Sequence, residues 1–441
     1  MDMTPKEIVA YLDQYIIGQY EAKKAIGIAL RNRYRRMQLE DEMQEEIMPK
    51  NILMIGTTGV GKTEIARRLS KMMSLPFVKV EASKYTEVGF VGRDVESMVR
   101  DLVMAAVNMV KAEHKEKNIS AIDDYVQKKI IEKLLPPLPS GASEQKKEDY
   151  ERSHARMKQK LIDGELDDLK IEIEISKGMG EINDATMPPE MIKVQESFMK
   201  ILSAKSESIK KEVTVKEAKE ALKAEASENL LDFEAIKAEA LERAENSGII
   251  FVDEIDKVAV SAKSQSRQDP SKEGVQRDLL PIVEGSDVNT KYGVIKTNHI
   301  LFIAAGAFHL TKPSDLIPEL QGRFPLRVEL SSLSEETLCK IMTQPATSLL
   351  KQYEALLSTE GVTLKFEDEA IKEMAKVSQL ANEKMEDIGA RRLHTVLERV
   401  IEEISFTADE HKGETISVTK DLVKEKLDEV ASDEDLSRYI L

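Results

Sequence analysis

Residues 51–69 read Asn-Ile-Leu-Met-Ile-Gly-Thr-Thr-Gly-Val-Gly-Lys-Thr-Glu-Ile-Ala-Arg-Arg-Leu. The part from Gly56 to Thr63 fits the phosphate-loop pattern G-x-x-x-x-G-K-T. An apolar run suited to a buried strand precedes it, and a stretch with the spacing of an amphipathic helix follows. Because strand, glycine loop and helix stand in the order that the pattern requires, the stretch predicts a nucleotide site in an α/β fold. A glycine-rich structural turn is the weaker alternative.

The residues of this loop indicate ATP with Mg²⁺. Glycines let backbone N–H groups close around phosphate oxygens, and the start of the helix adds a favourable dipole. Lys62 can reach the β- and γ-phosphates, while the Thr63 hydroxyl can bind the metal. We expect the nucleotide contacts of the loop to come from Gly59, Val60, Gly61, Lys62, Thr63 and Glu64.

Composition narrows the class of protein. The chain has 441 residues and a net charge of −16, and this acidic balance argues against a general nucleic-acid binder, which needs a basic surface. Its one cysteine, Cys339, leaves no internal disulfide framework and no multi-cysteine zinc site. The N-terminus has no signal-peptide pattern, and no apolar run is long enough to span a membrane. We therefore expect a cytoplasmic protein without membrane contact.

A second strong pattern lies at residues 249–252, Ile-Ile-Phe-Val, which run directly into Asp253 and Glu254. It predicts a buried strand with two acids at its carboxyl end. In phosphate-loop enzymes the first such acid holds Mg²⁺ and the second polarises the attacking water. We assign those roles to Asp253 and Glu254; for this segment alone, a helix start with favourable acids is the alternative.

The distance between the two patterns indicates an insertion. Lys62 and Asp253 are 191 residues apart (253 − 62), whereas one or two crossover units would suffice to bring them to one metal. The intervening chain is rich in Lys and Glu and poor in aromatic residues. The expected divisions are a large domain from 1–109 and 244–332, a helical inserted domain at 110–243, and a mostly helical small domain at 333–441. Plain solvated helices without a function are the alternative for the insertion.

Taken together, the motifs resemble the Clp/Hsp100 branch of the AAA+ ATPases. The resemblance rests on the phosphate loop, Phe251-Val252-Asp253-Glu254, Pro318-Glu319-Leu320-Gln321-Gly322-Arg323 and Gly389-Ala390-Arg391-Arg392-Leu393. Four further segments make the resemblance more specific, because they match members that serve as the ATPase of a two-part protease. They are Ile16-Ile17-Gly18-Gln19, residues 86–92, residues 273–281 and the last six residues. The resemblance implies a phosphate-loop core with a parallel sheet, assembled as a homo-hexameric ring with nucleotide between subunits.

The resemblance also implies roles for residues that the patterns alone leave open. Arg323 would be the arginine finger that reaches a neighbour's γ-phosphate, Arg391 would sense the phosphate state from the small domain, and Ile17 would lie against adenine. Glu319 would be a further residue of the nucleotide site. Without the family, a surface arginine after a glycine turn would be the favoured interpretation of Arg323, and an arginine on a helix surface would be equally credible for Arg391.

Two segments would act on proteins. Phe90 and Val91, in Gly89-Phe90-Val91-Gly92, would form a pore loop that grips an extended chain; a turn with one buried Phe is the alternative. The terminal Tyr439-Ile440-Leu441 would dock on the peptidase, although most chain ends are disordered and idle.

The sequence departs from the family pattern at three places. Thr57 stands where proline is usual, at a position that contributes its backbone, and Phe90 stands where tyrosine is common. Ala304, Ala305 and Gly306 occupy the strand end where a polar first sensor is expected, so that role is assigned to no residue.

The predicted function is ATP-driven unfolding and threading of unfolded or tagged substrates into a bound peptidase, as part of proteolysis and the stress response. The chain would hydrolyse ATP but carry no peptidase activity of its own. A nucleic-acid motor and a stand-alone remodelling chaperone are the alternatives.

Overall fold

A computed structural model describes residues 3–47, 50–86, 93–135, 144–175, 209–229, 231–260 and 270–431. The chain forms two compact units. The first comprises Met1–Ala105, Arg243–Val288 and Val294–Leu441, and the second comprises Ala106–Glu242 and Asn289–Gly293. The predicted pore residues Phe90 and Val91, and the predicted docking residues Tyr439, Ile440 and Leu441, lie outside the described residues.

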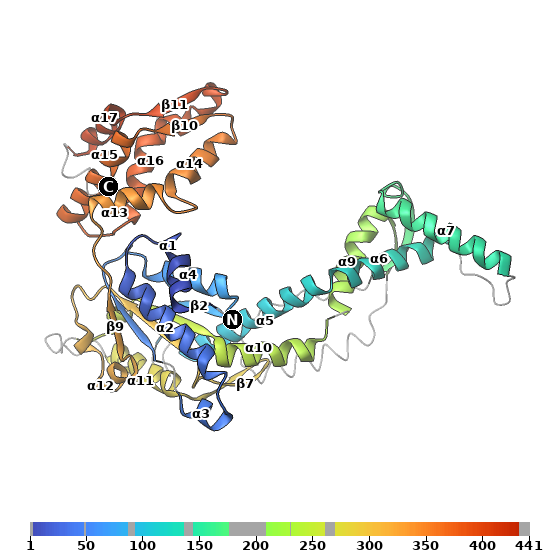
Figure 1. The fold of residues 1–441 in the computed structure, drawn as a ribbon, viewed down its shortest axis with the longest axis horizontal. Coiled ribbons are helices and arrows are strands. Elements are labelled where there is room, and N and C mark those ends of the chain that lie inside the picture. The colour runs from blue at the N-terminus through green and yellow to red at the C-terminus, as the bar shows by residue number, and fades with distance from the viewer. Residues whose placement is uncertain are drawn as a thin grey trace. The chain divides into compact units, whose positions relative to one another are not determined.

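A parallel sheet of five strands forms the centre of the first unit (Figure 1). Its order is β2-β5-β8-β1-β9, so the strand before the phosphate loop lies inside the sheet. The strands are β1 (Ile52–Ile55), β2 (Phe77–Glu81), β5 (Ile249–Asp253), β8 (Leu301–Gly306) and β9 (Leu326–Glu329). Runs of Ile, Val and Leu suit strands that are covered on both faces. The predicted parallel α/β core is confirmed.

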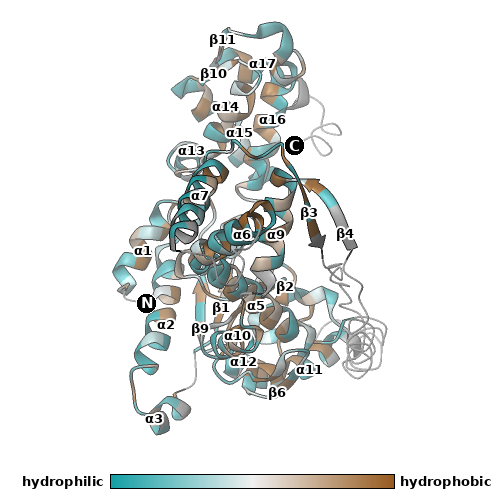
Figure 2. Ribbon diagram, turned by 90° about the vertical axis from the view of Figure 1, so that its right-hand side faces the viewer, coloured by the Kyte–Doolittle hydropathy of each residue, from teal (hydrophilic) through white to brown (hydrophobic). Residues whose placement is uncertain are grey.

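Amphipathic helices cover this sheet and supply most of its core. The elements are α1 (Pro5–Asp13), α2 (Tyr20–Arg36), α3 (Asp41–Glu46), α4 (Lys62–Met73), η1 (Ala82–Lys84), η2 (Ile255–Lys257), α11 (Pro270–Glu284), η4 (Pro313–Asp315) and α12 (Pro318–Arg323). Thr4 and Glu7 form a capping box at the start of α1. In Figure 2 the strand β1 is hydrophobic and the peripheral helix α3 largely hydrophilic.

A fully buried arginine fixes α2 to the sheet. The Arg33 guanidinium donates to the carbonyls of Gly248 (2.9 Å), Asn246 (2.8 Å) and His299 (2.8 Å). Burial, with a smaller effect of the neighbouring Arg36 charge, lowers the pKa of Arg33 to about 9. Because one guanidinium bonds three backbone carbonyls, Arg33 joins α2 to the approaches of β5 and β8.

The carboxyl-terminal part of the first unit has a hydrophobic core of its own. Its elements are α13 (Glu335–Thr343), α14 (Leu349–Ser358), β10 (Thr363–Phe366), α15 (Asp368–Lys384), α16 (Arg391–Phe406), η5 (Ala408–His411), β11 (Thr415–Val418) and α17 (Lys420–Ala431). The two strands pair in parallel beside the helices (Figure 1). We call residues 333–431 the small domain.

The second unit is mainly helical and also has its own core. The unit contains α6 (Ile119–Leu134), α7 (Glu144–Ile162), β3 (Lys170–Ile175), β4 (Ile209–Thr214) and α9 (Val215–Asn229). Three further elements belong to it in part: α5 (Ser97–Lys117), α10 (Phe233–Ser247) and the tip of the hairpin of β6 (Asp287–Thr290) and β7 (Gly293–Lys296). The strands β3 and β4 pair antiparallel. Among the described helices, none combines the length and apolar character needed to cross a bilayer.

Candidate nucleotide site

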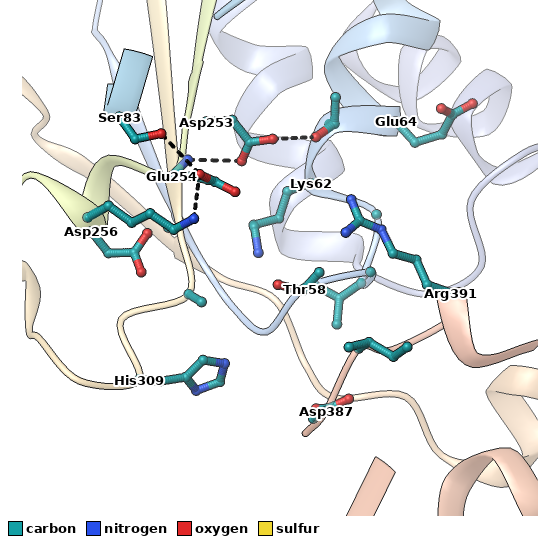
Figure 3. A pocket seen from close by; sticks show the side chains of 18 of the residues that line it. Thr58, Lys62, Glu64, Ser83, Asp253, Glu254, Asp256, His309, Asp387 and Arg391 are labelled. Atoms are coloured by element: carbon teal, nitrogen blue, oxygen red, sulfur yellow. Dashed lines mark hydrogen bonds and ion pairs between the residues drawn. The ribbon is translucent and has the colours of Figure 1, made fainter. Parts of the chain in front are cut away.

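A large pocket of ≈ 1710 Å³ opens at the carboxyl ends of the parallel strands, where ligands of open α/β sheets usually bind. The phosphate loop, the strand end at Asp253 and the small domain all contribute to it (Figure 3). The predicted site residues that line it are Ile17, Gly59, Val60, Gly61, Lys62, Thr63, Glu64, Asp253, Glu254 and Arg391. Residues from segments more than 300 positions apart therefore meet in one cavity.

The phosphate loop has the backbone shape of an anion cradle. Gly59 and Gly61 have φ values of +77° and +100°, a region that favours glycine, and α4 begins directly afterwards. The Lys62 ammonium donates to the carbonyl of Thr57 at 2.8 Å and also to that of Gly56. The Thr57 backbone thus serves the loop although proline is usual there, while its Oγ1 is buried with no partner among the described residues.

The electrostatic surroundings of Lys62 favour an incoming anion. Burial is the largest effect on its pKa and lowers it; Asp253 and Asp256 act in the opposite direction, and Arg391 lowers it further. A buried ammonium bonded only to carbonyls has lost hydration without gaining a full counter-charge. A phosphate in the loop would restore that charge.

Thr63 and Asp253 meet where a metal is expected. The Thr63 hydroxyl donates to Asp253 Oδ2 at 3.3 Å, and the Lys79 ammonium lies 2.8 Å from the same oxygen. A hydroxyl beside a carboxylate offers the hard oxygen ligands that Mg²⁺ takes, usually one or two carboxylates with waters and substrate phosphates. These two oxygens fit Mg²⁺ bound together with a nucleotide. Among the described residues, no group of three or more His, Cys, Asp and Glu could hold a metal.

Glu254 adopts a strained backbone at the edge of the pocket. Its φ of +58° and ψ of +35° are left-handed values that cost energy for a residue other than glycine. Its carboxylate lies 2.7 Å from the Lys257 ammonium and accepts from the Ser83 hydroxyl at 3.4 Å (Figure 3). The strand end thus directs both acids into the pocket, Asp253 toward Thr63 and Glu254 toward Ser83.

The small domain contributes through a backbone contact between two glycine loops. The Ala390 N–H donates to the Gly59 carbonyl at 3.2 Å. A Cβ built on Gly389 would lie 2.6 Å from the Thr58 carbonyl oxygen, and one built on Gly59 would lie 2.1 Å from that of Ile388. Only glycine permits this approach, and it brings Arg391, at the start of α16, to face the space beside Lys62 (Figure 3).

The predicted adenine side is built by the segment between α1 and α2. Tyr15, Ile16 and Ile17 line the pocket there. The fully buried Lys23 holds this segment by donating to the Ile16 carbonyl (2.5 Å) and to Asp13 (2.6 Å). The Ile17 role as an adenine contact stays a prediction, placed on a rigid segment of the pocket wall.

Two predicted site residues lie elsewhere. Arg323 and Glu319 are on α12 and do not line the pocket of their own chain. The Arg323 guanidinium pairs with Glu284 on α11 at 2.8 Å. Their roles stay predictions, and a finger that serves a neighbouring subunit has no need to reach the pocket of its own chain.

Sequence reasoning missed several polar residues of the pocket region. Lys79 pairs with Asp253, whereas Ser83 and Lys257 bond Glu254. His309 and Asp387 line the same cavity. Lys79 carried a usable signal as the charged residue between two valines, and Lys257 stands only three residues after Glu254.

Comparisons with known proteins agree with this geometry. Residues 51–163 match the model of the AAA domain, dynein-related subfamily, and residues 170–327 match that of the AAA domain, Cdc48 subfamily. An "ATP-dependent protease ATPase subunit HslU" of Helicobacter pylori (strain P12) is 66% identical over 441 residues, which is 100% of this chain and 99% of the relative. The chain belongs to the HslU family. Its identity is also 66% to the HslU subunit of Helicobacter acinonychis (strain Sheeba), over 100% of this chain and 99% of the relative.

The HslU relationship extends along the entire chain. The subunit of Campylobacter jejuni subsp. jejuni serotype O:2 is 64% identical over 441 residues, 100% of both chains. The family inferred from the motifs is therefore confirmed. These HslU relatives are named ATPase subunits, and together with the AAA domains this identifies the chain as an ATP hydrolase.

Proposed function

We propose that this HslU-family chain hydrolyses Mg·ATP in the pocket described above and uses the energy to unfold proteins and feed them to the HslV peptidase, which it also activates. The observation that carries the proposal is the meeting of the phosphate loop, the acids at the end of β5 and Arg391 in one cavity. Full-length identity of 64–66% to HslU subunits supports the same conclusion.

Each residue at the proposed site has a role that its contacts support. The loop from Gly59 to Thr63, with Glu64 beyond it, would hold the phosphates, and Lys62 would compensate their charge. Thr63 and Asp253 would hold Mg²⁺, which would supply charge stabilisation at the phosphates. Glu254 would orient and polarise the attacking water, which requires its carboxylate to leave Lys257. Arg391 would respond to the phosphate state from the small domain.

Assembly would complete the site. In the proposed homo-hexamer, Arg323 and Glu319 on α12 would serve the nucleotide of a neighbouring subunit. An arginine supplied in trans stabilises transition-state charge only in the assembled ring. The exposed position of α12 residues Glu319 and Arg323 supports this proposal.

Substrates and the peptidase would be contacted elsewhere. Phe90 and Val91 would grip unfolded or tagged proteins in the pore, and Tyr439, Ile440 and Leu441 would dock on HslV. The inserted helical unit would help to receive substrates. The proposed location is the cytoplasm, with a part in stress-related proteolysis.

Two variants with opposite effects test the proposal. Deleting the last eight residues should leave ATP hydrolysis intact and abolish stimulation of HslV peptide cleavage. Glu254→Gln should bind ATP and HslV but not hydrolyse ATP. Stimulation that survives the deletion would contradict the docking role, and undiminished hydrolysis by Glu254→Gln would contradict the water-polarising role.

The alternatives predict different results. A nucleic-acid motor would show DNA-stimulated ATP hydrolysis at moderate salt, against which the net charge of −16 argues. A stand-alone remodelling chaperone would unfold proteins without binding a peptidase ring. Co-migration of the chain with HslV, with and without ATP, separates the chaperone from the proposed function.

A further inference from the structure

A buried glutamine on α11 has no role in the function proposed so far. Gln276 lies within the segment 273–281 that helped to identify the family, and its side chain is 0% exposed. The next residue differs, because Arg277 is exposed and pairs with Glu273 on the same helix. A neutral amide in a fully buried position requires partners for both of its polar atoms.

Gln276 finds those partners on two separate functional segments. Its Nε2 donates to the Val258 carbonyl at 2.7 Å, and its Oε1 accepts from the Ile317 N–H at 2.8 Å. Val258 immediately follows the segment of Asp253, Glu254 and the turn η2. Ile317 is the residue before α12, the helix of Glu319 and Arg323. One side chain therefore links the segment after the acidic strand end to the start of the arginine helix, beside a backbone bond from the Val260 N–H to the Asp315 carbonyl at 3.2 Å.

The rest of α11 strengthens this link. Val275, adjacent to Gln276, lines the nucleotide pocket, as does Lys272. At the end of the same helix, Glu284 accepts from the Arg323 Nε at 2.9 Å. The helix thus touches the pocket of its own chain and holds both the start and the arginine of α12.

We propose that Gln276 is a positioning residue that sets the place of α12, and with it the reach of Arg323, relative to the nucleotide site of its own chain. The inference rests on the proposed function, in which Arg323 acts on the nucleotide of a neighbouring subunit. Gln276 links the two sites because one amide bonds both the segment that follows the acids of the chain's own site and the residue before the helix that would serve the neighbour's site.

The amide is specific to this task. A methionine has similar length but neither hydrogen bond, and it leaves the Ile317 N–H and the Val258 carbonyl without this partner. A glutamate keeps the acceptor for Ile317 but replaces the donor to Val258 with a second acceptor. We therefore expect Gln276→Glu to be intermediate between the parent and Gln276→Met.

Mixed rings test where the defect lies. Arg323→Ala subunits retain their own acids but lack a finger, and Glu254→Gln subunits retain the finger but lack the water-polarising acid. Mixing these two should restore ATP hydrolysis, because each intact acid then meets an intact finger. Failure of this control mixture would contradict the trans role of Arg323, and so the proposed function itself.

The decisive mixture replaces Glu254→Gln by the double variant Glu254→Gln/Gln276→Met, which has no hydrolysis of its own and can only supply its finger. If Gln276 positions the finger, these subunits should restore hydrolysis to Arg323→Ala subunits about tenfold less well than the control mixture, a ratio that corresponds to a modest displacement of one charged group. Binding of a fluorescent ATP analogue by Gln276→Met should stay within about twofold of the parent chain, since the phosphate loop is untouched. Restoration equal to that of the control mixture would overturn the proposal.

Two further variants address stability. Gln352→Met removes an exposed amide that donates to the Thr347 carbonyl at 2.9 Å in the small domain, and it should hydrolyse ATP like the parent chain. If Gln276→Met does not assemble, Gln276→Glu takes its place in the double variant and should restore hydrolysis only in part. Full restoration by Gln276→Glu would also overturn the proposal.

Discussion

Replacing Gly389 by alanine should separate the small domain from the phosphate loop. Gly389 has a φ of +57°, and a Cβ there would lie 2.6 Å from the Thr58 carbonyl oxygen and 2.8 Å from the Gly59 carbonyl carbon. Both are backbone atoms that cannot rotate away. The loop must therefore shift and lose the Ala390 N–H bond to the Gly59 carbonyl.

The magnitude follows from a comparison with Gly413. Left-handed backbone costs a non-glycine residue about 1–2 kcal/mol, and this applies to both glycines. Gly413 has a φ of +89° but nothing within 4 Å of an added Cβ, so Gly413→Ala should lose only that stability. Gly389→Ala should also lose the contact between the small domain and the phosphate loop, whose hydrogen bond alone contributes about 1 kcal/mol or more.

The assay is titration of each variant with a fluorescent ATP analogue, together with thermal unfolding. Gly389→Ala should bind the nucleotide about five- to tenfold more weakly than the parent chain, because Arg391 moves with the displaced loop. Gly413→Ala should bind as the parent does while unfolding at a lower temperature. Parental affinity in Gly389→Ala, or an equal loss in both variants, would refute the reasoning.

Three further predictions concern catalysis and stability. Glu254→Gln should slow ATP hydrolysis at least about a hundredfold with little change in ATP affinity, measured by phosphate release; a smaller loss would assign the water to another group. Arg33→Met should lower the free energy of unfolding by about 3 kcal/mol because three backbone carbonyls each lose a hydrogen bond to the guanidinium. The exposed Arg35→Met should change it by less than about 0.5 kcal/mol in denaturant melts. Burial and the charges of Arg36 and Arg33 lower the pKa of His299 from 6.5 to about 4 in the folded chain. Because the unfolded state then binds the proton more readily, the free energy of unfolding should fall as the pH drops from about 6.5 toward 4. We expect about 1–2 kcal/mol at pH 5 after allowance for partial exposure of the ring, and a His299→Asn variant whose melting is as pH-sensitive as the parent's would exclude this cause.

The predictable part of the fold rests on local patterns. The run before the phosphate loop and the run before Asp253 are short, apolar and β-branched or aliphatic, and both became strands of the parallel sheet. The meeting of Lys62 with Asp253 followed from chemistry, since both were expected at one metal. The structure places them at the same pocket and brings the Thr63 hydroxyl within 3.3 Å of Asp253.

What the sequence could not predict depends on contacts between distant segments. No local pattern links Ser83 with Glu254, because their pairing arises from the way β2 and β5 lie side by side. The approach of Gly389 to the phosphate loop likewise depends on where the small domain packs, and a glycine alone does not reveal its neighbour. Nor does a buried amide such as Gln276 differ in sequence from an exposed one.

The central claim is that ATP hydrolysis at this pocket drives proteins into a partner peptidase. The most direct measurement is degradation of a stably folded protein by the purified chain with HslV, in the presence of ATP or of a non-hydrolysable analogue. The account predicts degradation with ATP, little with the analogue, and none when Glu254→Gln replaces the parent chain. Equal degradation with ATP and the analogue, or degradation by the chain without HslV, would contradict it.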